Sequence, residues 1–246
     1  MPEGATIALC SVNQNQILLA IRNELIYLEI HQSQIVEKAR LAMDNEIACI
    51  DCSPLNDDEQ AAICAVGLWN EISVSLLSLP DLAQIDKSQL SGDIIPRSLL
   101  ISSFCDIAYL FVSIGDGTLF YYRIEPGSKL GDTKRVQLGN QPTSLSRFKT
   151  SNGSSSVFAC SDRPAVIHSS NQKIFFSNVN LKQVNHMCQL DADGYENSLA
   201  LVNNTTLLIG TIDEIQKLHT TTIPVCLFVL LFCHALHFTL FSYPLH

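Results

Sequence analysis

The chain has 246 residues, of which 47% are hydrophobic and 16% are charged, and it carries a formal net charge of -9 at a sequence pI of about 5.1. This apolar content is sufficient for a folded core in one large domain or two small ones. Because a net acidic surface repels a phosphate backbone, the charge disfavours direct DNA or RNA binding by this segment.

A unit of an apolar run, a polar turn and a second apolar run occurs five times along the chain. The turns contain Asn, Asp or Gly, which tolerate left-handed backbone angles or hydrogen-bond to their own main chain. The flanking runs are rich in Val, Ile, Leu, Phe and Tyr, as β-strands are. The units span residues 18–30, 63–77, 110–124, 157–170 and 198–212, with turns near positions 23, 70, 116, 162 and 203. They therefore recur every 41 to 47 residues.

Further strand candidates lie between these hairpins, at residues 46–53, 97–104 and 141–148. A repeat of roughly 40–50 residues with about four strands is typical of a β-propeller blade, which buries its faces by stacking on its neighbours. The sequence thus predicts an all-β fold, an incomplete β-propeller of about four to five blades with an apolar C-terminal extension. The alternative is a β-sandwich, which lacks a fixed period of this length. Helix signals are scarce, and residues 31–46 are interpreted mostly as an interblade connection.

Several short motifs have the composition of catalytic or ligand sites but lack the rest of the pattern. The run Gly115-Asp116-Gly117 precedes a predicted strand, whereas a phosphate loop precedes a helix. Cys49 and Cys52 have no second cysteine pair and would face opposite sides of a strand. Residues 189–200 lack the terminal carboxylates of a calcium loop, and no GxSxG motif is present. From these motifs we assign no catalytic residue, no cofactor site and no metal site.

Two features leave alternatives open. Trp69, the single tryptophan, lies at a predicted turn, where it either packs against the next blade or is offered to a partner. Residues 223–246 contain no Asp, Glu, Lys or Arg and are about long enough to span a bilayer. They lack cationic flanks, so this tail is either a membrane segment or a non-native extension. Because no secretory signal is recognisable, the nine cysteines are expected to be reduced thiols.

Long stretches of the chain carry a resemblance to a known family. They include CAVGLWNEIS, IGDGTLFYYRI, VFACSDRPAVIHSSNQKIFFSNVNLKQVNHMC and DGYENSLALVNNTTLLIGTIDEIQKLH. Over roughly residues 4–219 the chain resembles the large subunits of the UV-damaged-DNA-binding complex, a family of cullin–RING ubiquitin ligase adaptors. Large subunits of pre-mRNA cleavage and splicing factors share the architecture and match less well.

The resemblance implies a non-enzymatic scaffold that acts in DNA damage repair and protein ubiquitination. It implies a cullin scaffold protein as partner, with substrate receptors held by parts of the family absent from this chain. In that family a smaller subunit makes most of the contact with damaged DNA, so no direct nucleic-acid binding is expected here. The expected location is the nucleus and also the cytoplasm. The alternatives are a membrane-anchored β-domain, or a relative of the pre-mRNA processing subunits that binds nucleic acid.

The resemblance also assigns domains and contact residues. Residues 1–210 match later blades of the middle propeller, 211–222 match the crossing toward the next propeller, and 223–246 form the apolar tail. The cullin-facing positions of the family match Glu46, Trp69, Ile95 and Arg97. For two of them a structural role is the alternative: Ile95 as the strand residue before Pro96, and Arg97 as a solvated charge or a partner of Asp93.

Overall fold

The computed structural model describes residues 8–55, 60–92, 94–150, 152–190, 192–212 and 218–224. Within these residues the chain forms twenty β-strands and no helix. The strands make five four-stranded antiparallel sheets, and in each sheet the spatial order of the strands is their order in the sequence. We call these sheets the first to fifth blades.

The first blade contains β1 (Ala8–Asn13), β2 (Gln16–Ile21), β3 (Glu24–His31) and β4 (Gln34–Ala42). The second contains β5 (Ile47–Asp51), β6 (Ile63–Leu68), β7 (Ser73–Ser78) and β8 (Gln84–Gln89). The third contains β9 (Pro96–Phe104), β10 (Ile107–Ile114), β11 (Thr118–Glu125) and β12 (Lys129–Gln137). The fourth contains β13 (Ser144–Lys149), β14 (Ser155–Cys160), β15 (Ala165–Ser170) and β16 (Lys173–Asn178). The fifth contains β17 (His186–Leu190), β18 (Ser198–Val202), β19 (Thr206–Ile212) and β20 (Leu218–Pro224).

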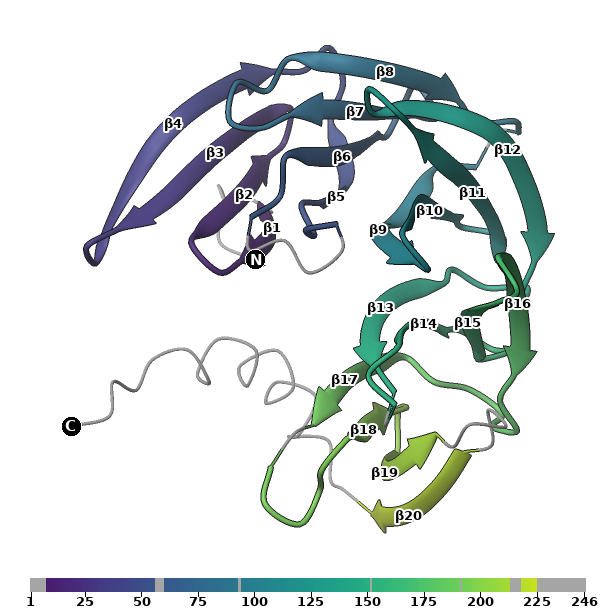
Figure 1. The fold of residues 1–246 in the computed structure, drawn as a ribbon. Coiled ribbons are helices and arrows are strands. Elements are labelled where there is room, and N and C mark those ends of the chain that lie inside the picture. The colour runs from purple at the N-terminus through teal and green to yellow at the C-terminus, as the bar shows by residue number, and fades with distance from the viewer. Residues whose placement is uncertain are drawn as a thin grey trace, which may run out of the picture.

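The five blades follow one another around an arc, with the first strand of each blade toward the centre and the fourth at the outside (Figure 1). This confirms the predicted propeller architecture and rules out the β-sandwich. Each of the five predicted turns connects the second and third strands of a blade, so the sequence repeat is the blade repeat. The arc stays open between the fifth and the first blade (Figure 1).

The interpretation of residues 31–46 as a connection is wrong for most of the segment. Residues 34–42 form β4, the outer strand of the first blade, which pairs with β3 along its length. Most side chains of β4 are exposed, because an outer strand has only one neighbouring strand and lies at the edge of the blade. The alternation of apolar and polar residues that marks a half-buried strand is therefore missing here.

Packing between blades explains why the central strands are continuously apolar. Every residue of β6 is buried. Ile63 and Ala65 enter the apolar cluster shared with the third blade, whereas Cys64, Val66 and Leu68 enter the cluster shared with the first. Successive side chains of a strand point to opposite faces, so a strand between two neighbours must be apolar on both. Four such clusters join the five blades in series.

The end of the described chain bears on the predicted domain division. Residues 218–224 form β20, which pairs with β19 as the fourth strand of the fifth blade, so part of the predicted crossing lies within this sheet. Residues 213–217 and 225–246, which include almost all of the predicted tail, lie outside the described residues. In the described part of the chain, no helix has the length and apolar character needed to cross a bilayer.

Candidate protein-binding surface

The four predicted contact residues lie at one end of the second and third blades. In an antiparallel blade, the start of the first strand and the turn between the second and third strands lie at the same end, which we call the turn face. Glu46 precedes β5 and Trp69 follows β6. The Trp69 amide donates a hydrogen bond to the Glu46 carbonyl oxygen at 2.9 Å, so the two positions are adjacent.

The loop carrying Glu46 is fixed to the neighbouring blade as well. The amide of Ile47 donates to the carbonyl oxygen of Arg22 at 2.8 Å, and the amide of Met43 donates to that of Asn23 at 2.8 Å. Both acceptors lie in the turn between β2 and β3 of the first blade. Backbone hydrogen bonds thus run across the turn face from the first blade to Trp69, while the Glu46 side chain remains exposed to solvent.

Arg97 and Trp69 form the centre of this surface. The guanidinium carbon of Arg97 lies 5.5 Å from the centroid of the indole ring, within cation–π distance. Trp69 is 40% exposed despite its size, and Arg97 is exposed. The two side chains therefore contact each other and remain accessible to solvent.

A glycine allows the two blades to approach closely beneath this pair. Gly67 lies in β6, two residues before Trp69. A Cβ at this position would lie 2.8 Å from the Cys49 sulfur and 3.0 Å from Cγ of Pro96, the first residue of β9. Because Gly67 has no side chain, Pro96 packs directly onto β6, and Arg97 follows it into position over Trp69.

The structure also places the two isoleucines before Pro96. Ile95 is half-buried, whereas Ile94 is 38% exposed and is the more accessible apolar side chain. A Cβ on Gly115, in the turn of the third blade, would lie 3.0 Å from Cγ2 of Ile94 and 3.8 Å from Nε of Arg97. Ile94 therefore belongs to the same surface. The pattern Ile-Ile-Pro could not show which isoleucine is outermost. Asp93, the alternative partner of Arg97, lies outside the described residues.

A buried carboxylate holds together the strands that carry these residues. Asp51, at the end of β5, accepts a hydrogen bond from the Ile101 amide of β9 at 2.6 Å and another from the Ser53 hydroxyl at 2.8 Å. Burial raises the pKa of Asp51, although these hydrogen bonds act in the opposite direction. Arg147 of the fourth blade donates to the Ile101 carbonyl at 2.8 Å, so the inner strands of three blades share one polar link.

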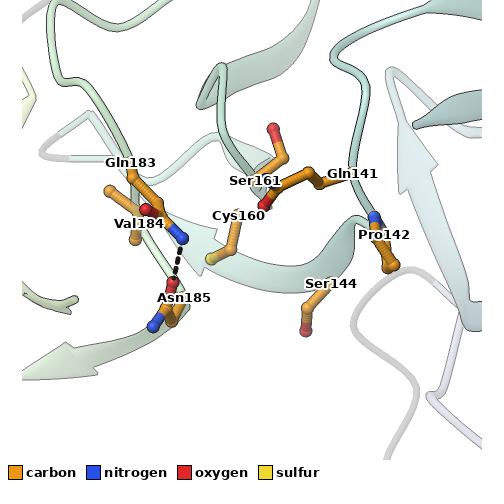
Figure 2. A pocket seen from close by; sticks show the side chains of 8 residues that line it. All are labelled: Gln141, Pro142, Ser144, Cys160, Ser161, Gln183, Val184 and Asn185. Carbon is orange, nitrogen blue, oxygen red and sulfur yellow. Dashed lines mark hydrogen bonds between the residues drawn. The ribbon is translucent and has the colours of Figure 1, made fainter. Parts of the chain in front are cut away.

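A separate shallow pocket lies between the fourth and fifth blades (Figure 2). Its lining is neutral and comprises Gln141, Pro142, Ser144, Cys160, Ser161, Gln183, Val184 and Asn185. The Gln183 side-chain amide donates a hydrogen bond to the Asn185 side-chain oxygen at 3.0 Å, so these two polar groups of the lining already bind each other. Burial raises the pKa of the Cys160 thiol to about 12, so the sulfur stays protonated and is a poor nucleophile. The lining contains no His, Asp, Glu, Lys or Arg that could act as a general acid or base, and none of the four predicted contact residues lies in it.

Two of the motifs interpreted as structural, the Cys49–Cys52 pair and the turn at residues 115–117, lie as predicted. Cys49 packs toward the third blade and Cys52 toward the first, so their thiols point apart as predicted. The Gly115-Asp116-Gly117 turn joins β10 to β11, and Gly117 has a φ of 82° that favours glycine. Among the described residues, no group of three or more metal-ligating side chains comes together.

Comparison with known proteins is consistent with this geometry. The family model described as the RSE1/DDB1/CPSF1 second β-propeller matches residues 1–212. DNA damage-binding protein 1 of Drosophila melanogaster is 48% identical over 221 residues, which cover 89% of this chain and 19% of the relative. The protein of the same name from Oryza sativa subsp. japonica is 47% identical over 226 residues, 91% of this chain and 21% of the relative. DNA damage-binding protein 1a of Arabidopsis thaliana is 43% identical over 236 residues, which cover 95% of this chain and 22% of the relative. The chain thus spans about a fifth of the length of the curated relatives it matches.

Proposed function

This chain belongs to the family of the RSE1/DDB1/CPSF1 second β-propeller, and we propose that it is a non-enzymatic scaffold segment that docks a cullin through the turn face of its second and third blades. The docking residues in this proposal are Trp69 and Arg97 at the centre, with Glu46 and the Ile94–Ile95 pair around them. Relatives that are 42–48% identical carry the name DNA damage-binding protein 1. The proposed setting is a cullin–RING ubiquitin ligase of DNA damage repair, in the nucleus and also the cytoplasm.

The observation that carries the proposal is the exposed Arg97–Trp69 pair. Hot spots of protein interfaces are enriched in Trp and Arg, and they lie among contacts that exclude water. An ordered pair loses less side-chain entropy on binding than two mobile residues would. Glu46 and Arg97 have opposite charges, which can give a partner a defined orientation on this face.

The alternative of nucleic-acid binding, drawn from the pre-mRNA processing subunits that share the family model, has less support. The formal charge of the chain is -9, and affinity for nucleic acid arises largely from Lys and Arg contacts to phosphates. The two functions predict different salt dependence. Steeply salt-sensitive RNA binding would favour the nucleic-acid function.

The direct test is calorimetry or a pull-down of the full chain with a cullin amino-terminal domain. We expect saturable binding with a shallower salt dependence than nucleic-acid binding would show, since Trp69 offers apolar contact and Arg97 and Glu46 carry opposite charges. Failure to bind a folded cullin domain, with the chain itself shown to be folded by circular dichroism, would contradict the proposal.

A further inference from the structure

The pocket between the fourth and fifth blades opens on the turn face, as does the surface around Trp69. Its lining comes from three segments that meet at this end of the blades: the start of β13, the end of β14 and the loop before β17 (Figure 2). Trp69 lies at the seam between the second and third blades, two seams away along the arc. The pocket is therefore a separate feature of the same face.

The pocket lies where a tryptophan stands at the other seam. β6 and β14 are both six-residue second strands, and each pairs with the first strand of its own blade up to its last residue, Leu68 in β6 and Cys160 in β14. The next residue is Trp69 in the second blade and Ser161 in the fourth, so these two positions correspond. Trp69 places a large ring at its seam, whereas the small side chain of Ser161 lines a hollow.

The size and charge of the hollow limit what it can hold. Its volume is about 210 Å³, below the range of roughly 300–1,000 Å³ that is usual for cofactor and drug sites. This volume suits a single side chain better than a whole cofactor. No side chain of the lining is charged, so an ion that lost its water here would find no opposite charge. The occupant that fits is one uncharged group.

The lining offers both hydrogen-bond donors and acceptors to such a group. Among the described residues, the side chains of Gln141 and Ser144 have no hydrogen-bond partner. The Ser161 hydroxyl accepts from the Arg163 amide at 3.0 Å, which leaves its own proton available to donate. A carboxamide, the head group of Asn and Gln, both donates and accepts, whereas a carboxylate only accepts. The carboxamide is therefore the neutral side-chain group that uses this lining most fully.

We propose that this pocket recognises a carboxamide side chain, Asn or Gln, presented by a protein partner on the turn face. The head group hydrogen-bonds to Gln141, Ser144 and Ser161, and its methylene groups lie against Cys160 and Val184, which are buried. The inference does not rest on cullin docking, because the pocket is two seams away from the docking residues. Either proposal can fail while the other holds.

Titration of the full chain with short peptides, followed by NMR, tests the recognition directly. The probes are acetyl-Gly-Gln-Gly-amide and the same peptide with Glu or Leu in the middle. The Gln peptide should shift the amide signals of Ser161, Val184 and Asn185 with a Kd of roughly 1–10 mM, as expected for one small anchoring group. The Glu and Leu peptides should bind about tenfold more weakly. Equal affinity for all three peptides, or no shift at these amides, would overturn the proposal.

Free L-glutamine distinguishes a protein partner from a small-molecule ligand. It has the same carboxamide, but its ammonium and carboxylate groups find no opposite charge in the lining. We therefore expect it to bind about tenfold more weakly than the Gln peptide. Tighter binding of the free amino acid would assign the pocket to a small molecule and overturn the assignment to a protein partner.

Filling the pocket should remove binding. Ser161→Trp introduces the residue that stands at the corresponding position of the other seam, and the Kd for the Gln peptide should rise at least about tenfold. Ile35→Trp is the control, because it adds the same ring at a side chain that is 65% exposed on the first blade. If circular dichroism shows that Ser161→Trp is unfolded, Gln141→Leu replaces it, since this side chain is exposed and its loss removes only hydrogen-bonding groups. Unchanged affinity in a folded Ser161→Trp or in Gln141→Leu would contradict the site.

Discussion

The guanidinium of Arg97 lies 5.5 Å from the centre of the Trp69 indole, although the two residues belong to different blades. Trp69 follows the second strand of the second blade, and Arg97 lies near the start of the first strand of the third. The candidate surface is therefore formed at a seam between blades, and its geometry depends on how closely the blades approach.

Replacing Trp69 should weaken cullin binding more than any other single change on the turn face. Trp69→Ala removes the exposed ring and the stacking partner of Arg97, and we expect a loss of about 2 kcal/mol or more, or roughly thirtyfold in Kd. Isothermal titration calorimetry with the cullin domain measures this change in Kd. The matched control is Phe175→Ala, which removes an aromatic ring that is 45% exposed on the fourth blade. Equal losses for both variants would count against a specific role for Trp69.

Adding one methyl group at Gly67 should affect stability and binding together. Gly67→Ala places a Cβ against Cys49 and Pro96, and we expect a loss of about 1–3 kcal/mol in the free energy of unfolding. Binding should weaken as well, because the shift of Pro96 moves Arg97. Shortening the neighbouring side chain with Cys49→Ala should relieve part of the clash, so the double variant should be more stable than the sum of the single effects predicts. If the losses in unfolding free energy of the two single variants, measured by urea denaturation, simply add in the double variant, the Cβ at position 67 does not clash with the Cys49 side chain.

Two buried serines should respond in opposite ways to loss of the hydroxyl group. The Ser75 hydroxyl has no hydrogen-bond partner among the described groups, so Ser75→Ala should leave stability unchanged or raise it by up to about 1 kcal/mol. Ser113 is its control, because its hydroxyl donates to the Thr143 carbonyl at 2.5 Å across the seam between the third and fourth blades. Ser113→Ala should cost about 1–2 kcal/mol. If the denaturation midpoints of Ser75→Ala and Ser113→Ala both fall, the missing hydrogen-bond partner of Ser75 does not explain its effect on stability.

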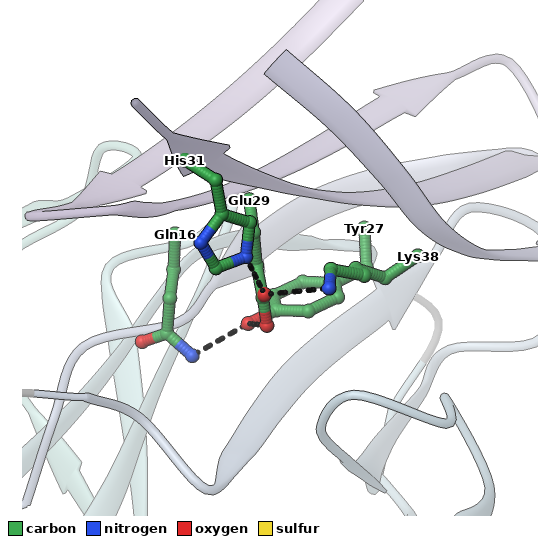
Figure 3. Close-up of polar contacts among 5 residues, drawn as sticks. All are labelled: Gln16, Tyr27, Glu29, His31 and Lys38. Atoms are coloured by element: carbon green, nitrogen blue, oxygen red, sulfur yellow. Dashed lines mark hydrogen bonds and ion pairs between the residues drawn. The ribbon is translucent and has the colours of Figure 1, made fainter. Parts of the chain in front are cut away.

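Glu29 lies in a group of polar side chains of the first blade with Tyr27, His31 and Lys38 (Figure 3), and loss of its charge should make the protein less stable in acid. Burial alone would raise the pKa of Glu29, but hydrogen bonds from His31, Tyr27 and Lys38 outweigh it and lower the pKa from its ordinary value of 4.5. The His31 and Tyr27 contacts are 2.8 and 3.0 Å long. A lowered pKa in the folded state means that the stabilisation is complete above pH 4.5 and is lost as the pH falls through the folded-state pKa.

The variant Glu29→Gln tests this pH dependence. It should be less stable than the parent at pH 7, and the difference should shrink as the pH falls below about 4.5, because the parent then loses its charge. Urea unfolding at several pH values measures the difference. Glu37→Gln is the control, since its ion pair with Arg40 is on the surface and should be weakened by salt. A constant difference from pH 7 to pH 3 would exclude the proposed role of the Glu29 charge.

The sequence by itself determined the repeat. Turn residues such as Asn23, Asn70 and Asp116 mark one position in successive blades because local backbone chemistry decides where a hairpin reverses. The outer strand β4 was missed because its exposure removes the apolar alternation on which strand prediction depends.

Only the tertiary structure decided how the contact residues meet. Spacing along the chain placed Trp69 at a turn, but its contact with Arg97 requires two blades to approach across Gly67 and Pro96. The choice between Ile94 and Ile95 as the exposed residue also depends on the neighbouring turn at Gly115. Local sequence sets hairpins because their partners are adjacent in the chain, whereas a surface at a seam is set by packing between residues that are distant in sequence.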